Sequence, residues 1–481
     1  MRRAVGSYVA RAHIACAAGF VVLWTANASA DGPLGANGTP ITTSQYNVDL
    51  FQGPVLATTR IMSLGGAYTA IAEGADAIPF NPAAVSHRAP YSTSRVDWDV
   101  TGGITLPTSV TNTDFDNNGD TNFQTKNFVW GSAGGQIQYD HLGIGILASG
   151  QNYVLNQDQI IRIPDIPEAA DKVVIRVLKI DAVASYGFFD DQLHVGGGLR
   201  TAHLRAIGVA RDASATATTS ADLTGDERER QLFATDAFGV QGGILWVPRA
   251  LPLRLGGAAR SPLVGAINEN EGRFKIDPTT KDIRAGDFYF PEKVDLPWEV
   301  ELGGAVQLWK RPFNLGWTDE EKVPVADTER YRQTVREGVQ EPAWQGARRL
   351  LKKRYKAIPR ERVLISTTVL LSGATRNAVG FESMLARRVE RSGERLSVTV
   401  RGGIEAEVIP NWLVVRGGSY LEPTRFAASS SRLHGTAGLQ AKVFEWGAFG
   451  LTDPDTAWRV SLGGDIARDY FAWSVGAGFF R

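Results

Sequence analysis

An acidic stretch near residue 115 has side chains that could bind a calcium ion. It reads Asp114-Phe115-Asp116-Asn117-Asn118-Gly119-Asp120. Oxygen ligands at the first, third and fifth positions and glycine at the sixth match the start of an EF-hand loop. Thr125 stands where that loop needs its bidentate glutamate. The sequence therefore predicts either a structural calcium site formed by Asp114, Asp116, Asn118 and Asp120 or a plain turn rich in Asn, Asp and Gly.

Residue patterns of a catalytic site are absent from the sequence. The histidines beyond residue 30 are scattered and form no H-E-x-x-H motif; they are His87, His141, His194, His203 and His434. The sequence also has no nucleophile elbow and no P-loop. An enzyme is therefore not expected, and apart from the candidate calcium ion no cofactor is expected.

Polar side chains alternate with apolar ones along several segments. Between residues 395 and 408 apolar side chains recur at every second position, and residues 298–308, 458–466 and 471–479 repeat the pattern. A period of two is that of a β-strand. Segments of this length suit tilted membrane strands of about 9–11 residues better than soluble strands of about 5–6. The sequence predicts an all-β protein, a transmembrane antiparallel β-barrel, with a soluble β-sandwich as the alternative.

The polar face of these segments would line the lumen of such a barrel. Buried networks of ion pairs are the simplest explanation for its mixed charges. The charged residues expected to face the lumen are Glu299, Glu301, Arg395, Arg401, Glu405, Glu407, Arg416, Arg459 and Asp465.

Turn signals divide residues 91–481 into about fourteen strands. An even number returns the C-terminus to the side where the barrel begins, as in bacterial barrels. With this count, five tryptophans fall on the periplasmic rim: Trp246, Trp309, Trp412, Trp446 and Trp458. An aromatic girdle is typical of a membrane interface.

The first thirty residues are typical of an export signal. Arg2, Arg3 and Arg11 precede or flank an apolar run from Ile14 to Trp24, and Ala28-Ser29-Ala30 forms a cleavage site. Residues 1–30 are therefore predicted to be a signal peptide, and the chain is expected in the bacterial outer membrane, in contact with its lipid. Cys16, the one cysteine, lies in this signal, so the mature chain would have no thiol. Lys plus Arg and Asp plus Glu both number 51, which gives no indication of nucleic-acid binding.

Residues 63–83 are small and apolar and end at a proline. Helical character from Ser63 to Glu73 precedes Asn81-Pro82-Ala83, which cannot continue a helix. Residues 60–73 together with Asn81-Pro82-Ala83 resemble the N-terminal signature of the FadL-type outer-membrane transporters. Residues 239–248, 253–262 and 413–420 are similar to later strands of that family.

The resemblance implies a fourteen-stranded barrel with a small helical hatch in its lumen. It implies passive uptake of hydrophobic compounds such as long-chain fatty acids, with the hatch as the gate. Residues 31–90 would form the hatch segment and residues 91–481 the barrel. The hatch residues implied are Gly65, Gly66, Ala67, Tyr68, Asn81, Pro82 and Ala83.

The same signature also resembles PorV-like barrels, which act as partners of a protein-export apparatus. A non-conducting structural partner, bound to a periplasmic or secretion-apparatus protein, is therefore the alternative. Arg260-Ser261-Pro262 favours a transporter, whereas the charged lumen favours a partner.

Residues 318–361 interrupt the strand pattern. The segment is rich in arginine and lysine after residue 347, and Leu350, Leu351 and Tyr355 could form an apolar stripe on a helix. Strand parity places this insertion on the periplasmic side. It could contact lipid headgroups or a partner, or it could be a solvated helix without a partner.

Overall fold

The computed structural model describes most of the chain beyond residue 32. The described residues are 33–51, 53–88, 92, 95–107, 114–119, 125–162, 168–214, 216, 222–267, 275–277, 279–285, 288–318, 343–447 and 457–479. The predicted signal peptide, residues 1–30, and the predicted ligand Asp120 lie outside them.

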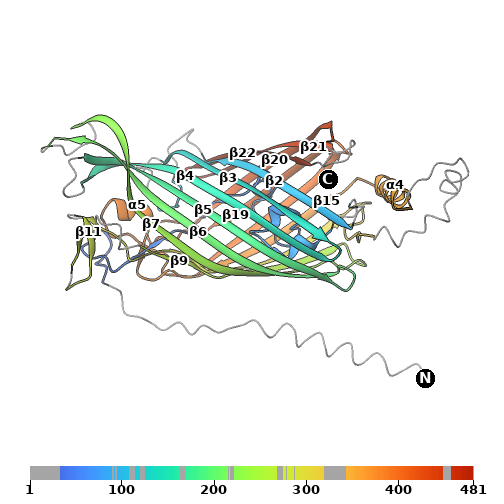
Figure 1. The fold of residues 1–481 in the computed structure, drawn as a ribbon, viewed down its shortest axis with the longest axis horizontal. Coiled ribbons are helices and arrows are strands. Elements are labelled where there is room, and N and C mark those ends of the chain that lie inside the picture. The colour runs from blue at the N-terminus through green and yellow to red at the C-terminus, as the bar shows by residue number, and fades with distance from the viewer. Residues whose placement is uncertain are drawn as a thin grey trace, which may run out of the picture. The chain divides into compact units, whose positions relative to one another are not determined.

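Fourteen antiparallel strands close into a barrel, which confirms the predicted fold (Figure 1). The strands are β2 Val96–Leu106, β3 Thr125–Tyr139, β4 Leu142–Arg162, β5 Glu168–Phe188, β6 Leu193–Ala213, β7 Leu223–Trp246, β8 Leu253–Arg260, β14 Glu299–Leu308, β15 Val363–Ser372, β18 Ser397–Ile409, β19 Leu413–Glu422, β20 Arg432–Glu445, β21 Ala457–Ala467 and β22 Tyr470–Phe479. The first and last strands pair, with Gly102 opposite Ala477.

The alternation seen in the sequence sorts side chains between the two faces of the barrel wall. On β18, Val398, Val400 and Ile404 are exposed on the outside, whereas Arg401 and Glu405 are buried inside. A closed barrel leaves no unpaired strand edge, and an apolar outer face is what lipid requires. The wall is therefore that of a transmembrane barrel.

Among the described residues, no helix is long and apolar enough to cross a membrane.

The two ends of the barrel differ in the length of their connections. At one end, here called the turn end, β3 and β4 are joined through residues 140–141 and β18 and β19 through residues 410–412. The five tryptophans expected on one rim all lie at this end, next to the turns or at the insertion, and four of them are exposed: Trp246, Trp309, Trp412 and Trp446. The opposite end, the loop end, has most of the long connections, apart from the insertion between β14 and β15, which lies at the turn end.

A small sheet and a short helix fill the barrel at the loop end. The sheet has the order β17-β16-β1-β13-β9, formed by Arg391–Ser392, Ala378–Val379, Asn47–Asp49, Lys293–Leu296 and Leu263–Ala266. Helix α5, Phe381–Leu385, packs beside it, and three further strands pair nearby: β10 Lys275–Ile276, β11 Ile283–Ala285 and β12 Phe288–Tyr289.

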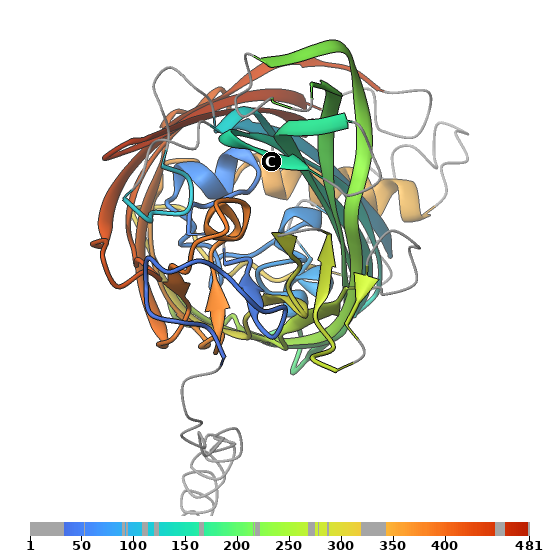
Figure 2. The ribbon, with the colours of Figure 1, turned by 90° about the vertical axis from the view of Figure 1, so that its left-hand side faces the viewer.

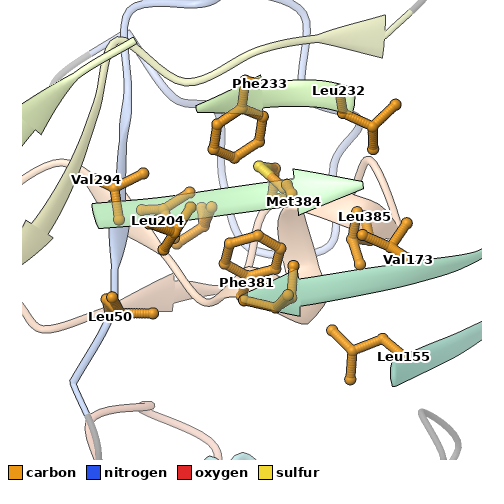
Figure 3. Packing of buried hydrophobic residues seen from close by; sticks show 14 of the residues in the cluster. Leu50, Leu155, Val173, Leu204, Leu232, Phe233, Val294, Phe381, Met384 and Leu385 are labelled. Atoms are coloured by element: carbon orange, nitrogen blue, oxygen red, sulfur yellow. The ribbon is translucent and has the colours of Figure 1, made fainter. Parts of the chain in front are cut away.

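Helix α5 forms the centre of a buried apolar cluster at this end (Figure 3). Phe381 and Met384 of α5 face side chains from the barrel wall, among them Val173 of β5, Leu204 of β6 and Phe233 of β7. We call this group, which also contains Leu50, Leu155 and Trp130, the loop-end cluster.

The chain between the loop-end sheet and β2 runs inside the ring of strands (Figure 2). We call residues 53–88 the lumen segment; it contains α2 Thr59–Ser63 and the 3-10 helices η1 Ala75–Ala77 and η2 Pro82–Ser86. The prediction of a helix from Ser63 to Glu73 is wrong, because α2 ends at Ser63. Gly65 and Gly66 follow with φ of 60° and 75°, a left-handed conformation that cannot continue a right-handed helix.

Helix α4, Ala343–Lys356, lies at the turn end within the basic insertion (Figure 1). Residues 319–342 of that insertion are outside the described part of the chain.

Candidate functional site

The lumen segment packs against the wall through backbone contacts that only small residues allow. A Cβ atom added to Gly418 of β19 would lie 2.4 Å from the carbonyl carbon of Leu64, and one added to Gly256 of β8 would lie 2.3 Å from the carbonyl oxygen of Thr69. Both positions therefore require glycine. The glycine-rich strands thus make room for the segment, and all seven predicted hatch residues are buried: Gly65, Gly66, Ala67, Tyr68, Asn81, Pro82 and Ala83.

Charged contacts fix the start of the lumen segment to the wall. Nε of Arg60 lies 3.1 Å from a carboxylate oxygen of Glu405 on β18, and the same guanidinium also pairs with Glu73. Glu405 is fully buried and accepts two further ion pairs, from Arg362 at 2.7 Å and Arg416 at 2.6 Å. Three arginines therefore depend on this one carboxylate.

Two neutral side chains anchor the rest of the segment. The hydroxyl of Thr69 donates to Glu301 of β14. The side-chain amide of Asn81 donates to the carbonyl oxygens of Thr69 at 3.0 Å and Ile244 at 2.9 Å, and its oxygen accepts from Ala83 at 3.1 Å. Asn81 therefore caps η2 and joins it to β7 at the same time.

A cavity of about 100 Å³ lies between the lumen segment and the wall. Leu56, Ile61 and Phe80 of the segment line one side. Trp130 and Leu147 of the wall line the other, and the charged groups Lys179, Asp181 and Arg200 form a polar edge. Leu56 and Trp130 also pack in or against the loop-end cluster. Apolar side chains are therefore continuous from the loop end to the lumen segment.

Ahead of the lumen segment, the chain is tied to the loop end by a buried ion pair. Asp49 of β1 accepts from Nε of Arg425 at 2.8 Å and from its Nη2 at 3.1 Å, and both side chains are almost fully buried. Thr375 and Ser392 donate to the same carboxylate. The lumen segment is thus held at both ends, by β1 at one and by β2 at the other.

Sequence reasoning missed a segment that covers the lumen at the turn end. The side-chain amide of Asn314 donates to the carbonyl oxygens of Pro248, Leu251 and Leu253, at 2.7 to 2.9 Å. The guanidinium carbon of Arg88 lies over the ring of Trp317, 4.1 Å from the ring centre. No period or motif marks residues 311–317, so only the tertiary structure shows this contact.

Most of the charged residues expected in the lumen make contacts there. Glu301 pairs with Arg260 at 3.2 Å and Arg401 at 3.5 Å, and Glu407 pairs with Arg311 at 3.5 Å. Glu299, Arg459 and Asp465 also bond to inward-facing side chains. Arg395 is the exception, because it is exposed and precedes β18, which begins at Ser397. The prediction that Arg395 faces the lumen is therefore wrong.

A buried polar group around His434 in the barrel wall contacts the lumen segment at Val55. His434 lies between Glu422, at 2.6 Å, and Asp465, at 2.8 Å, and the hydroxyl of Tyr420 donates to Asp465 at 2.7 Å. The same hydroxyl accepts from the backbone N–H of Val55 at 3.2 Å. These polar groups are buried among one another and provide a further anchor for the lumen segment.

The candidate calcium loop folds as a turn against α5. Backbone N–H groups of Asn118 and Gly119 donate to the carboxylate of Asp114 at 3.1 and 3.0 Å, and the side-chain amide of Asn118 donates to Glu382. Burial raises the pKa of Asp116 well above its usual value, and the charge of Asp114 adds to this. Among the described residues, which omit Asp120, no three acidic or imidazole groups are arranged to hold a metal. Calcium binding therefore stays a prediction.

If the loop binds calcium, Asp116→Ala should remove a calcium-dependent part of the thermal stability. A bound cation would favour the ionised form of a carboxylate that burial disfavours, so chelator should lower the melting temperature of the unsubstituted protein and leave that of the variant unchanged. The exposed loop-end residue Asp226, replaced by alanine, is the control. Equal melting temperatures of the unsubstituted protein with and without chelator would leave only the turn.

No family model matches the chain, and no curated protein matches it. Similar solved structures are the CymD monoaromatic hydrocarbon channel, the Ralstonia pickettii toluene transporter TbuX and a Pseudomonas aeruginosa FadL homologue. Each is 11% identical to this chain; the TM-scores are 0.45, 0.42 and 0.41. The matches cover 89%, 90% and 92% of this chain and 97%, 98% and 98% of those chains.

Proposed function

We propose that this chain is an outer-membrane channel for passive uptake of hydrophobic compounds, with the lumen segment as its gate. The observation that carries the proposal is the continuity of apolar side chains from the loop-end cluster through Leu56 and Trp130 to the cavity beside the segment. A hydrophobic solute entering at the loop end would remain in contact with apolar groups as far as the gate. In this proposal the loop end is extracellular and the turn end is periplasmic.

Opening would be a local rearrangement of the lumen segment. The segment cannot leave the barrel as a unit, because β1 pairs with β13 and β16 at one end and the chain enters β2 at the other. Its attachment combines apolar packing, in which Ile61, Leu64 and Tyr68 are buried, with a set of polar anchors. Such anchors can be exchanged one for another as the segment shifts.

Long-chain fatty acids are the solute class that we propose from the FadL resemblance. The cavity offers suitable chemistry, since apolar side chains of Phe80 and Leu147 lie beside Lys179 and beside Arg200, which pairs with Asp181 at 3.0 Å. A carboxylate could lie at this edge while its chain contacts the apolar wall.

One observation favours the alternative, a PorV-like structural partner. Helix α4 at the turn end exposes Arg349, Lys353 and Lys356, which lie on one face at helical spacing. An acidic surface of a periplasmic protein would complement this face.

Uptake of a labelled fatty acid by a strain that lacks the gene tests the channel. Uptake should fall in that strain and return with the unsubstituted chain. Trp130→Gln, which places an amide in the apolar route, should restore less uptake than the control Trp446→Gln at the turn end. Both variants must appear heat-modifiable in the outer-membrane fraction. Normal uptake in the deletion strain, together with defective secretion, would refute the channel and favour the partner.

A further inference from the structure

A groove of about 970 Å³ lies on the outer face of the barrel across β2 to β6. Its outward side chains are apolar or aromatic: Trp98, Val100, Ile137, Tyr139, Ile144, Ile146, Ala182, Ala184 and Leu199. These residues belong to the surface that faces lipid, so the groove is part of the membrane contact and not of the lumen.

Small residues and the lumen segment together explain the depression. Gly135, Ala182, Ala184 and Gly197 leave the outer face low between larger neighbours. On the inner side, a Cβ atom on Gly145 would lie 2.8 Å from Cδ1 of Ile78, so the wall rests directly on the lumen segment. The pairing of β4 with β5 is unbroken from Leu142–Tyr186 to Asn156–Lys172. The groove is therefore a hollow in a closed wall and not an opening through it.

The groove lies on the turn-end part of the outer face and ends at polar groups. From Leu142 to Ile146, β4 advances four residues, roughly 14 Å along the strand at about 3.4 Å per residue. With a strand tilt of about 35–45°, this is about 10–11 Å along the membrane normal, about a third of a hydrocarbon core of about 30 Å. At the turn end, Arg95 pairs with Asp140 at 2.6 Å and lies 5.6 Å from the ring centre of Tyr139. Both charged side chains are partly exposed, at 37% and 27%.

We propose that this groove binds one acyl chain of a zwitterionic phospholipid from the turn-end leaflet. The chain lies against Ile137, Ile144 and Ala184, and the headgroup lies over the ion pair. Its phosphate accepts from the guanidinium of Arg95, and its ammonium donates to the carboxylate of Asp140. A pair of opposite charges at the mouth matches a headgroup that carries both charges. The inference does not depend on the channel function, because the groove faces away from the lumen.

Native mass spectrometry of delipidated protein titrated with dipalmitoyl-phosphatidylethanolamine tests the groove. Ala184→Leu fills it from a position whose side chain points to lipid, and Ala437→Leu makes the same change on the exposed outer face of β20, outside the groove. The unsubstituted protein and Ala437→Leu should each bind one lipid with similar affinity. Ala184→Leu should bind at least about tenfold more weakly, because the added side chain occupies the place of the acyl chain. Equal binding by the two variants would overturn the proposal.

Two further arms separate folding and headgroup effects. If Ala184→Leu fails to show the heat shift of a folded barrel, Ala182→Leu on the same face of β5 takes its place. Arg95→Gln should weaken binding of the phospholipid and leave binding of dipalmitoylglycerol unchanged. An equal effect of Arg95→Gln on both lipids would overturn the assignment of the headgroup.

Discussion

Replacing Glu405 with alanine should release the start of the lumen segment from the barrel wall. The change leaves the guanidiniums of Arg60, Arg362 and Arg416 without their shared carboxylate inside the barrel. Breaking a buried ion pair by removing one partner typically costs about 3–5 kcal/mol. The barrel itself should survive, because its closed ladder of strands does not depend on this contact, whereas the segment should detach from β18.

Thiol labelling of Ser63→Cys measures that release. Ser63 is 1% exposed, and after removal of the predicted signal peptide the introduced cysteine is the only thiol. We expect no labelling in the otherwise unsubstituted protein and rapid labelling when Glu405→Ala is added. Labelling reports on Ser63 itself, whereas steady conductance depends on every segment that lies in the lumen.

Glu407→Ala is the matched control for this experiment. Glu407 faces the lumen from the same strand, two residues further on, but pairs with Arg311 and not with the lumen segment. Ser63→Cys should stay protected in this background. If Glu405→Ala leaves Ser63→Cys as protected as Glu407→Ala does, the ion pair of Arg60 is not what holds the segment.

Replacing Asp49 with alanine should open the loop end. The guanidinium of Arg425 would lose a bidentate partner in a site where both side chains are at most 2% exposed. Thr375 and Ser392 would lose the same acceptor, so several loop connections are destabilised at once. A cost of about 3–5 kcal/mol is again the expected scale. We expect β1 to leave the small sheet and residues 33–51 to become mobile.

Limited proteolysis of intact cells checks this prediction. If the loop end is extracellular, added protease should cleave Asp49→Ala near its N-terminus and leave the unsubstituted protein intact. Asp226→Ala, which removes an exposed loop-end carboxylate on β7, should remain resistant. Resistance of Asp49→Ala equal to that of Asp226→Ala would show that β1 is not held by the ion pair.

Local patterns in the sequence predicted the strands of the barrel. Alternation at a period of two depends only on neighbouring residues, so it gave the strands, their approximate starts and the side of each strand that faces lipid. The common rim of Trp246, Trp309, Trp412 and Trp446 followed from an even strand count. The small residues around Gly65 and Gly66 indicated a tightly packed segment for the same local reason.

The tertiary structure decided what no local pattern contains. The pairing of Asn47 with Lys293 and Ala378 joins segments more than two hundred residues apart, and short strands of two to four residues have too little alternation to be recognised. The end of α2 at Ser63 depends on the left-handed conformation of two glycines pressed against β18 and β19. Arg395 lies outside the lumen because pairing with β15 begins only at Ser397. The loop-end cluster, the covering segment of residues 311–317 and the outer groove arise from contacts between distant parts of the chain. The free energies of such contacts depend on which surfaces meet and not on sequence spacing.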